Sequence, residues 1–229
     1  MSRSIGVVVA VELGAVLERY GTPTETAQFN GFTVRSYIRD GIEMHVVDSG
    51  AGEIAAAAST QMLIDRFNVD MILNFGVVGA LTEQMRTAEL CVVESVIHHQ
   101  FHTDGWLDLP RGLYPGRDTP YFYPDKELIA RAIAVEPSLQ KVVCASGDKF
   151  VDLEEDKREL AKNCKADICE MEAAGIVITC ERNKVPCLLL KAISDSLIGG
   201  GKEFFEELER VSAICFEVAD RVMQNFAQE

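Results

Sequence analysis

Two groups of acidic residues follow apolar runs that have the length and composition of β-strands. Glu170-Met171-Glu172 closes one run and opens a helical pattern, and Ser194-Asp195 closes another, shortly before Gly199-Gly200-Gly201. A carboxyl group beside such a glycine loop loses contact with water when the loop closes, so its pKa rises and it can donate a proton at neutral pH. Taken alone, Glu172 fits a helix N-terminal acid equally well, and Asp195 fits a helix cap. Their occurrence together favours acid–base chemistry.

Glycine-bearing turns follow three of the predicted strands. They read Ser49-Gly50-Ala51-Gly52, Asn74-Phe75-Gly76-Val77-Val78-Gly79 and Ser146-Gly147-Asp148. Open α/β sheets bind ligands at the carboxyl ends of their strands, where glycine lets a ligand approach the backbone amides. None of the turns continues into Gly-Lys-Ser/Thr or reads Gly-x-Gly-x-x-Gly, so they indicate neither a phosphate-binding P-loop nor a dinucleotide fingerprint.

Strands and helices that alternate along the chain must position these residues. The spacing of apolar residues predicts helices over residues 52–67, 173–181 and 202–226, the last one amphipathic and closing the fold. Residues 98–124 contain four prolines and predict a long surface loop. We expect an α/β protein, one three-layer α/β/α domain over residues 1–229 with a central mixed twisted sheet. The predicted strands are residues 5–11, 44–47, 71–74, 90–96, 141–145, 166–169 and 186–193.

Composition and charge narrow the classes of partner. The net charge of −14 repels phosphate backbones and anionic lipids, so we expect neither nucleic acid nor membrane as a partner. The N-terminal apolar run is too short for a signal sequence or a membrane span, which favours a cytoplasmic protein. The seven cysteines form no Cys-x-x-Cys pair, and His98, His99 and His102 lack the spacing of a zinc protease. The sequence therefore predicts no metal and no cofactor.

Several motifs in one order resemble the nucleoside phosphorylase superfamily and, within it, the methylthioadenosine/S-adenosylhomocysteine nucleosidases. The resemblance extends through most of the chain. The motifs are Ile5-Gly6 with Ala10, Ser49-Gly50-Ala51-Gly52, Asn74-x-Gly76-x-x-Gly79-x-Leu81, Ser146-Gly147-Asp148-Lys149-Phe150, Cys169-Glu170-Met171-Glu172-Ala173-Ala174-Gly175-Ile176, Val185-Pro186 and Lys191-Ala192-Ile193-Ser194-Asp195.

The resemblance implies how the reaction runs. Asp195 would protonate the purine at N7, so that the base leaves as a neutral molecule. Glu172 would hold the ribose hydroxyls and stabilise an oxocarbenium-like sugar, an assignment that suits N-glycoside cleavage. The substrate-binding residues that the resemblance implies are Phe150, stacked on the base, Val151, Met171 along the ribose, Ser194, which orients Asp195, and Val78 and Gly79.

The nucleophile side departs from the family pattern. The water-activating glutamate of the family lies four residues after the first-strand alanine, and this position is Gly14 here. Glu12 takes that role if the chain is re-routed there, whereas in a regular helix its side chain points elsewhere. Val77 and Lys191 stand where the nucleosidases carry serine and arginine.

These features favour a purine nucleoside N-ribohydrolase that cleaves methylthioadenosine, S-adenosylhomocysteine or a related 5′-modified nucleoside. Residues near 6–14 and 74–81 include no arginine or lysine to hold phosphate, so water is the favoured nucleophile. A purine nucleoside phosphorylase and a nucleoside-binding homologue without turnover remain alternatives. The resemblance also implies a homodimer and a place in methionine salvage.

Overall fold

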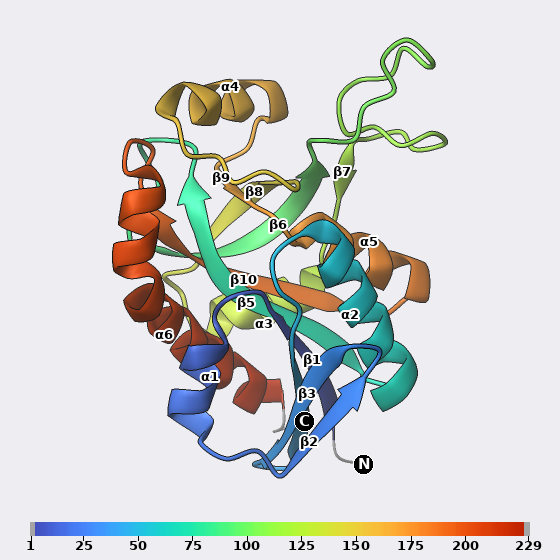
Figure 1. The fold of residues 1–229 in the computed structure, drawn as a ribbon, viewed down its shortest axis with the longest axis vertical. Helices are drawn as coiled ribbons and strands as arrows, with labels where there is room; N and C mark the ends of the chain where they lie inside the picture. The colour runs from blue at the N-terminus through green and yellow to red at the C-terminus, as the bar shows by residue number, and fades with distance from the viewer. Residues whose placement is uncertain (1–2, 227–229) are drawn as a thin grey trace.

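The structure, a computed structural model, describes residues 3–226 and contains a mixed sheet flanked by helices (Figure 1). None of the described helices has both the length and the apolar composition that crossing a bilayer requires. The strands are β1 (Arg3–Val9), β2 (Glu25–Phe29), β3 (Phe32–Arg39), β4 (Ile42–Asp48), β5 (Met71–Ala80), β6 (Leu90–His98), β7 (Tyr121–Phe122), β8 (Gln140–Ser146), β9 (Ile168–Glu170) and β10 (Cys187–Asp195). The helices are α1 (Leu13–Tyr20), α2 (Glu53–Phe67), α3 (Lys126–Val135), α4 (Glu154–Cys164), α5 (Ala173–Asn183) and α6 (Gly200–Phe226).

Part of the sheet closes on itself. β10 pairs in parallel with β5 and antiparallel with β6, and β5 returns to β6 through β9 and β8. The strands β1, β4, β3 and β2 extend the sheet from the other side of β5. The carboxyl ends of β5 and β10 lie side by side, because Gly79 is the register partner of Asp195. This pairing brings two distant segments of the sequence to one point.

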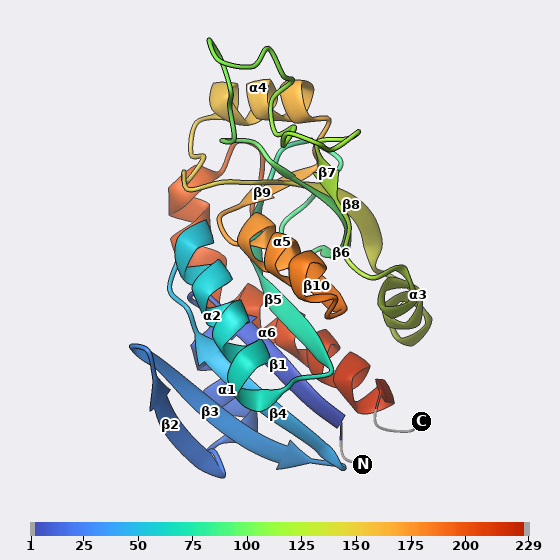
Figure 2. The same ribbon diagram turned by 90° about the vertical axis from the view of Figure 1, so that its right-hand side faces the viewer.

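Two hydrophobic layers cover the faces of the sheet, as the alternation along β10 shows. Leu188, Leu190 and Ala192 pack on the side of α1, α3 and α6, whereas Leu189 and Ile193 pack on the side of α2 and α5. Successive side chains of a strand point to opposite faces, so a strand buried on both faces is apolar throughout. Figure 2 shows α2 and α5 together along one face, and α4 lies across the end of the sheet. The expected α/β/α arrangement with a central mixed sheet is confirmed.

Most predicted elements are present, with three kinds of correction. The prediction of β1 to residue 11 was wrong, since the strand ends at Val9. Gly76 and Gly79 do not lie in a turn but inside β5, which continues to Ala80 because β9 and β10 both pair with its second half. The β2–β3 hairpin and the helices α1, α3 and α4 were not predicted, and the 98–124 loop includes the short strand β7.

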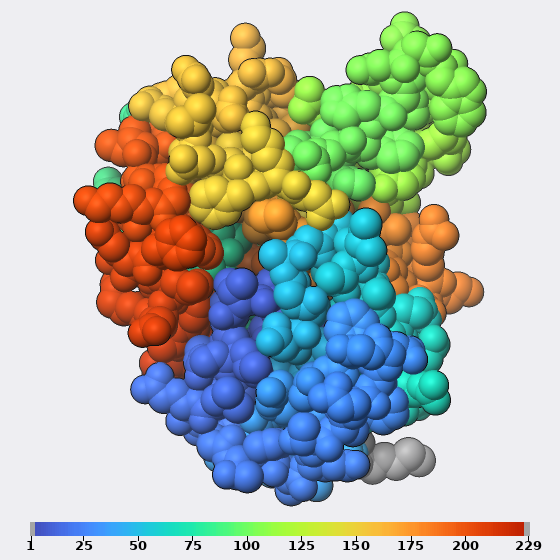
Figure 3. Space-filling model, viewed as in Figure 1, coloured from blue at the N-terminus to red at the C-terminus, as the bar shows by residue number. Residues whose placement is uncertain are grey.

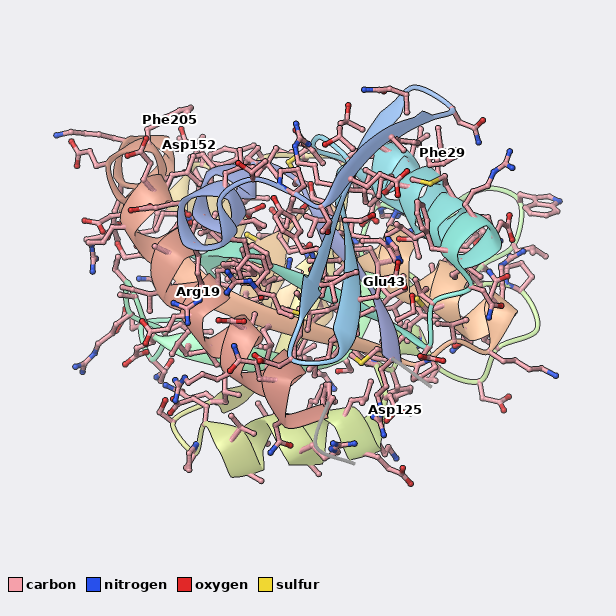
Figure 4. All side chains as sticks on the ribbon, turned by 90° about the horizontal axis from the view of Figure 1, so that it is seen from below. Arg19, Phe29, Glu43, Asp125, Asp152 and Phe205 are labelled. Carbon is pink, nitrogen blue, oxygen red and sulfur yellow. The ribbon has the colours of Figure 1, made fainter. Side chains whose placement is uncertain are left out.

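Helix α1 is fixed to α6 by polar contacts at its far end. Asp220 on α6 accepts a hydrogen bond from the Arg19 Nε at 2.5 Å and another from the Tyr20 hydroxyl at 2.6 Å. Arg19 is labelled beside α6 in Figure 4. Because Tyr20 and Asp220 are both buried, this contact holds the helix that follows Glu12 in a defined place.

Candidate active site

A cavity opens where the carboxyl ends of the strands meet the segments around residues 10, 51, 150 and 204. Figure 3 shows it as a hollow between the dark blue, cyan, yellow and red segments. Counting its open mouth, its volume is about 630 Å³. The residues that line it are Ala10, Val11, Glu12, Ala51, Val77, Val78, Gly79, Lys149, Phe150, Val151, Cys169, Glu170, Met171, Glu172, Ser194, Asp195 and Phe204.

Asp195 ends β10 with its carboxyl group in this cavity. Its Oδ1 accepts a hydrogen bond from the Ser194 hydroxyl at 2.8 Å, and its Oδ2 accepts one from Lys157 Nζ at 2.5 Å. Gly79 leaves room for the group, since a Cβ atom there would lie 3.0 Å from Oδ2. Burial raises the pKa of Asp195 above its usual value, although the Lys157 ammonium opposes this effect. These contacts hold the group in position, and burial favours its protonated form more than water would.

Glu172 lies between β9 and α5, at the position of an N-cap, but its side chain does not cap the helix. Its Oε1 instead accepts a hydrogen bond from the Gly52 backbone N–H at 2.9 Å. Gly52 reaches this geometry with a φ of +108°, which disfavours any residue with a side chain. Burial and the nearby Glu170 carboxylate raise the pKa of Glu172 to about 7. The first glycine turn of the sequence thus serves to hold this carboxylate.

Glu170 is the acid that caps α5. Its Oε2 accepts from the backbone N–H groups of Glu172 and Ala173, at 3.1 and 2.9 Å, and from Lys191 Nζ at 3.2 Å. Burial disfavours the charged form of Lys191, but the carboxylates of Glu170, Glu172 and Glu12 outweigh it and raise the pKa of Lys191. Lys191 is therefore a buried cation that offsets the acidic side chains, and it does not line the cavity.

A second buried acid, Glu53, lies behind Glu170. The Ser146 hydroxyl contacts the carboxyl groups of both Glu53 and Glu170, and it accepts a hydrogen bond from the Ala174 N–H at 3.0 Å. Burial, reinforced by the charge of Glu170, raises the pKa of Glu53 to about 8. A hydroxyl has one proton to donate, so one of the two carboxyl groups must bring its own. Glu53 is the one that is protonated at neutral pH.

Glu12 stands just before α1, outside the regular helix, where the chain bends away from β1. Its Oε2 accepts from the N–H groups of Ala10 and Val11, and its Oε1 accepts from the N–H of Val77 at 3.0 Å. The side chain therefore turns into the cavity instead of following the helix. Gly14, the position expected from the family spacing, lies inside α1 and does not line the cavity.

All nine residues predicted for catalysis and substrate binding border this one cavity. Besides the three acids, they are Val78, Gly79, Phe150, Val151, Met171 and Ser194. Ser194 contacts Asp195 directly, and Phe150, 44% exposed, packs its ring against Phe204 at the mouth of the cavity. Lys191, considered as a ligand for an anion, is instead paired with Glu170.

The sequence motifs did not predict three residues that contribute to the site: Lys157, Glu53 and Phe204. Lys157 shares the buried stripe of α4 with Leu160 and Cys164, at a spacing of three and seven residues. A lysine on the apolar stripe of a helix is the signal that identifies it. Glu53 offers no such signal, because an acid in the first turn of a helix normally faces solvent.

Comparison with known proteins places this geometry in a family. A family model described as "Phosphorylase superfamily" matches residues 4–227. The chain belongs to the phosphorylase superfamily. This confirms the family expected from the order of the motifs.

Among relatives in the superfamily, the aminodeoxyfutalosine nucleosidase of Helicobacter pylori strain J99 is 30% identical over 216 residues, covering 91% of this chain and 93% of that protein. The 5′-methylthioadenosine/S-adenosylhomocysteine nucleosidase of Bacillus subtilis is 28% identical over 210 residues, covering 88% of each. A crystal structure of the Helicobacter pylori 5′-methylthioadenosine/S-adenosylhomocysteine nucleosidase, complexed with a substituted pyrrolidin-3-ol, superposes with a TM-score of 0.93 at 27% identity and covers 98% of this chain and 99% of that chain.

Proposed function

We propose that this superfamily member is a purine nucleoside N-ribohydrolase that cleaves a 5′-modified nucleoside to free base and sugar. The observation that carries the proposal is that Asp195, Glu172 and Glu12 all border one cavity whose other walls are largely apolar. Cleavage of an N-glycosidic bond needs an acid at the leaving base, a negative partner for the sugar and a held water molecule. The three carboxyl groups meet these needs separately.

Asp195 acts at the base. In its protonated form it donates a proton to N7 of the purine while the bond from C1′ to N9 breaks, and the electron pair of that bond stays with the ring. The base then leaves as a neutral molecule. Ser194 holds the acid in place, and Phe150, Val78 and Val151 form the apolar slot for the ring.

Glu172 acts at the sugar. Its ionised carboxylate holds the ribose hydroxyls beside Met171 and lies close to the positive charge that develops on the ring. Electrostatic stabilisation of such a charge is strong in a site that excludes water. The Gly52 N–H and the nearby Lys191 ammonium favour the ionised form that this role requires.

Glu12 acts on water. A carboxylate has about four acceptor positions, and three of those of Glu12 are taken by backbone N–H groups, at 3.0 to 3.1 Å. One position remains to accept a hydrogen bond from a water molecule and then its proton. Because the three amides fix the carboxylate, the water is held in a fixed direction toward the sugar.

The charges of the cavity favour water over phosphate as the nucleophile. In residues 3–226, no arginine lines it, and its one lining lysine, Lys149, pairs with Asp156 at 2.8 Å. Four lining carboxyl groups would repel an anion, whereas phosphate sites gather arginine and hydroxyl groups.

The names of the relatives supply the substrates to test. The purified protein is incubated with methylthioadenosine, S-adenosylhomocysteine, aminodeoxyfutalosine, adenosine and inosine, with and without phosphate, and free base is measured. Release without phosphate is the expected result, with the 5′-modified nucleosides preferred. Release that depends on phosphate would show a phosphorylase, and binding without release would show a receptor; either outcome would overturn the proposal.

We also propose that the protein acts as a homodimer. Trp106, 77% exposed within the 98–124 loop, supports this, since an exposed tryptophan suits an interface. Light scattering coupled to size-exclusion chromatography tests it, and a monomeric mass with full activity would contradict it.

A further inference from the structure

Lys157 is a buried lysine that points at the end of β10. Its side chain is 0% exposed, and the Asp195 side chain that it contacts is 3% exposed. Besides the 2.5 Å hydrogen bond to Asp195 Oδ2, its Nζ donates to the Ser196 backbone carbonyl at 2.8 Å. Removing a charged lysine from water is costly unless an opposite charge compensates it. The Asp195 carboxylate therefore compensates the buried charge of Lys157, which apolar packing alone would not.

The fold presents Lys157 to Asp195 from a separate helix. Lys157 takes the place of an apolar residue on the inner stripe of α4, in line with Leu160 and Cys164. The segment that leads into α4 is itself fixed, because Asp152 accepts a hydrogen bond from the Gly201 N–H, at the start of α6, at 2.5 Å. Figure 4 shows Asp152 near the same end of α6 as Phe205.

The groups around Asp195 come from several elements. Lys157 faces it from α4, Ser194 from β10, Glu203 from α6 and the Cys169 thiol from β9. Glu203 is engaged elsewhere, since it accepts hydrogen bonds from the N–H and hydroxyl of Ser196. Within residues 3–226, Lys157 is the cationic side chain in contact with Asp195.

We propose that Lys157 is the positioning residue that makes Asp195 a strong enough acid to protonate the leaving purine. The inference rests on the proposed function and deepens it at the same site. When Asp195 gives its proton to N7, its carboxyl group becomes an anion inside a site closed to water. The Lys157 ammonium, already in contact with Oδ2, stabilises that anion and keeps its own protons. The proton thus passes from Asp195 to the base, and Lys157 lowers the free energy of the group left behind.

This role has a definite consequence for acidity. Without Lys157, the Ser194 hydrogen bond would still oppose the effect of burial on Asp195 but no ammonium group would, so the pKa of Asp195 would rise further and it would give up its proton less readily. A general acid works best when its pKa lies near the working pH. Lys157 therefore tunes the acidity of Asp195, so that the carboxyl group can hold its proton before the reaction and release it to the base.

The test compares the pH profile of kcat/KM for the wild-type protein, Lys157→Met, Lys157→Gln and Lys157→Arg, with methylthioadenosine as substrate. We expect Lys157→Met to shift the alkaline limb of the profile to higher pH, by at least about one pH unit. It should also lower kcat/KM at neutral pH by about tenfold or more. Lys157→Arg, which keeps the charge, should restore the position of the limb. Lys162→Met, an exposed lysine of the same helix, is the control and should leave the profile unchanged.

An unmoved limb in a folded Lys157→Met protein would overturn the inference, and so would an equal loss in Lys157→Arg. If Lys157→Met does not fold, Lys157→Gln decides, because its amide can still bond Asp195 and Ser196 but carries no charge. A direct measurement separates this inference from the proposed function: the Asp195 carboxyl is titrated by ¹³C NMR and assigned by its loss in Asp195→Asn. Full activity of Asp195→Asn would end the proposed function, whereas an Asp195 pKa that is the same with and without Lys157 would end this inference alone.

Discussion

Gly76 lies directly against the carboxyl group of Glu12: a Cβ atom at Gly76 would come within 2.6 Å of Glu12 Oε1. The next residue of β5, Val77, donates its N–H to the same oxygen. The strand thus offers a hydrogen-bond donor and the empty space that the carboxylate needs in order to reach it. Glycine at position 76 is explained by this contact and not by an unusual backbone angle.

Gly76→Ala should therefore displace Glu12 without unfolding the protein. We expect kcat to fall to about the level of Glu12→Gln, and the double variant to be no worse than either single one, because both changes remove the same contact. Gly14→Ala is the matched control, since its Cβ would meet nothing within 4 Å. It should keep full activity and gain up to about 1 kcal/mol in free energy of unfolding. Equal activity of Gly76→Ala and wild type would contradict the role of Glu12.

Asp195→Asn should abolish most of the turnover. General-acid help is worth about 10²- to 10⁴-fold in rate, and kcat for base release should fall within that range. The melting temperature should also fall, because Lys157 keeps its charge while its partner becomes neutral. Asp125→Asn is the matched control: Asp125 caps α3, and asparagine caps helices equally well. A folded Asp195→Asn protein with wild-type kcat would remove this residue from the mechanism.

Glu172 should give the activity an acidic limb. Its role requires the ionised form, and burial together with Glu170 raises its pKa to about 7. The value of kcat/KM should accordingly rise with pH through about pH 7, as Glu172 loses its proton, up to the pH at which the alkaline limb set by Asp195 begins. Steady-state assays between pH 5 and 8 measure this limb. A flat profile over that range would show that the charge of Glu172 does not matter.

Glu53 should make the folded state less stable as the pH rises. Its pKa is raised from 4.5 to about 8, so the folded protein holds a proton that the unfolded chain releases above about pH 4.5. The contribution of this proton to the free energy of unfolding has its full value below about pH 4.5 and is lost as the pH rises toward 8. Each pKa unit corresponds to about 1.4 kcal/mol, so Glu53→Gln should be more stable than wild type at pH 8 by up to about 5 kcal/mol.

The glutamine in Glu53→Gln imitates the protonated acid, since its amide can donate to Ser146 and accept from Gly175. Urea unfolding at pH 5 and pH 8 measures the difference, and at pH 5 the two proteins should be nearly equal. A stability difference that is the same at both pH values would mean that Glu53 does not carry the extra proton.

The base and ribose sides of the site were accessible from the sequence because their residues stand in short motifs at strand ends. Glu170-Met171-Glu172 and Ser194-Asp195 needed only the prediction of two apolar strands and of the helix after residue 172. Once such strands lie in one sheet, their carboxyl ends meet, and the side chains there become neighbours.

The partners of these residues were harder to predict, because each comes from a separate element. Lys157 reaches Asp195 across 38 residues of sequence, and Gly52 reaches Glu172 across 120. The direction of Glu12 depends on how the chain leaves β1, which spacing alone left open. Gly76 and Gly79 were assigned to a turn because glycine is rare inside strands, yet here two acidic side chains lie against them.

The strands β5, β9, β8, β6 and β10 form a closed ring. This ring separates the residues that carry the chemistry, which must keep their positions, from the residues at the mouth of the cavity, which can be substituted. Asp195 and Glu170 end strands of the ring, whereas Phe150 lies in the connection between β8 and α4 and Phe204 lies in the first turns of α6. Mutations that reshape the mouth need not disturb the paired backbone. Such a division makes the protein evolvable: descendants can acquire a different nucleoside while they inherit the same bond-breaking step.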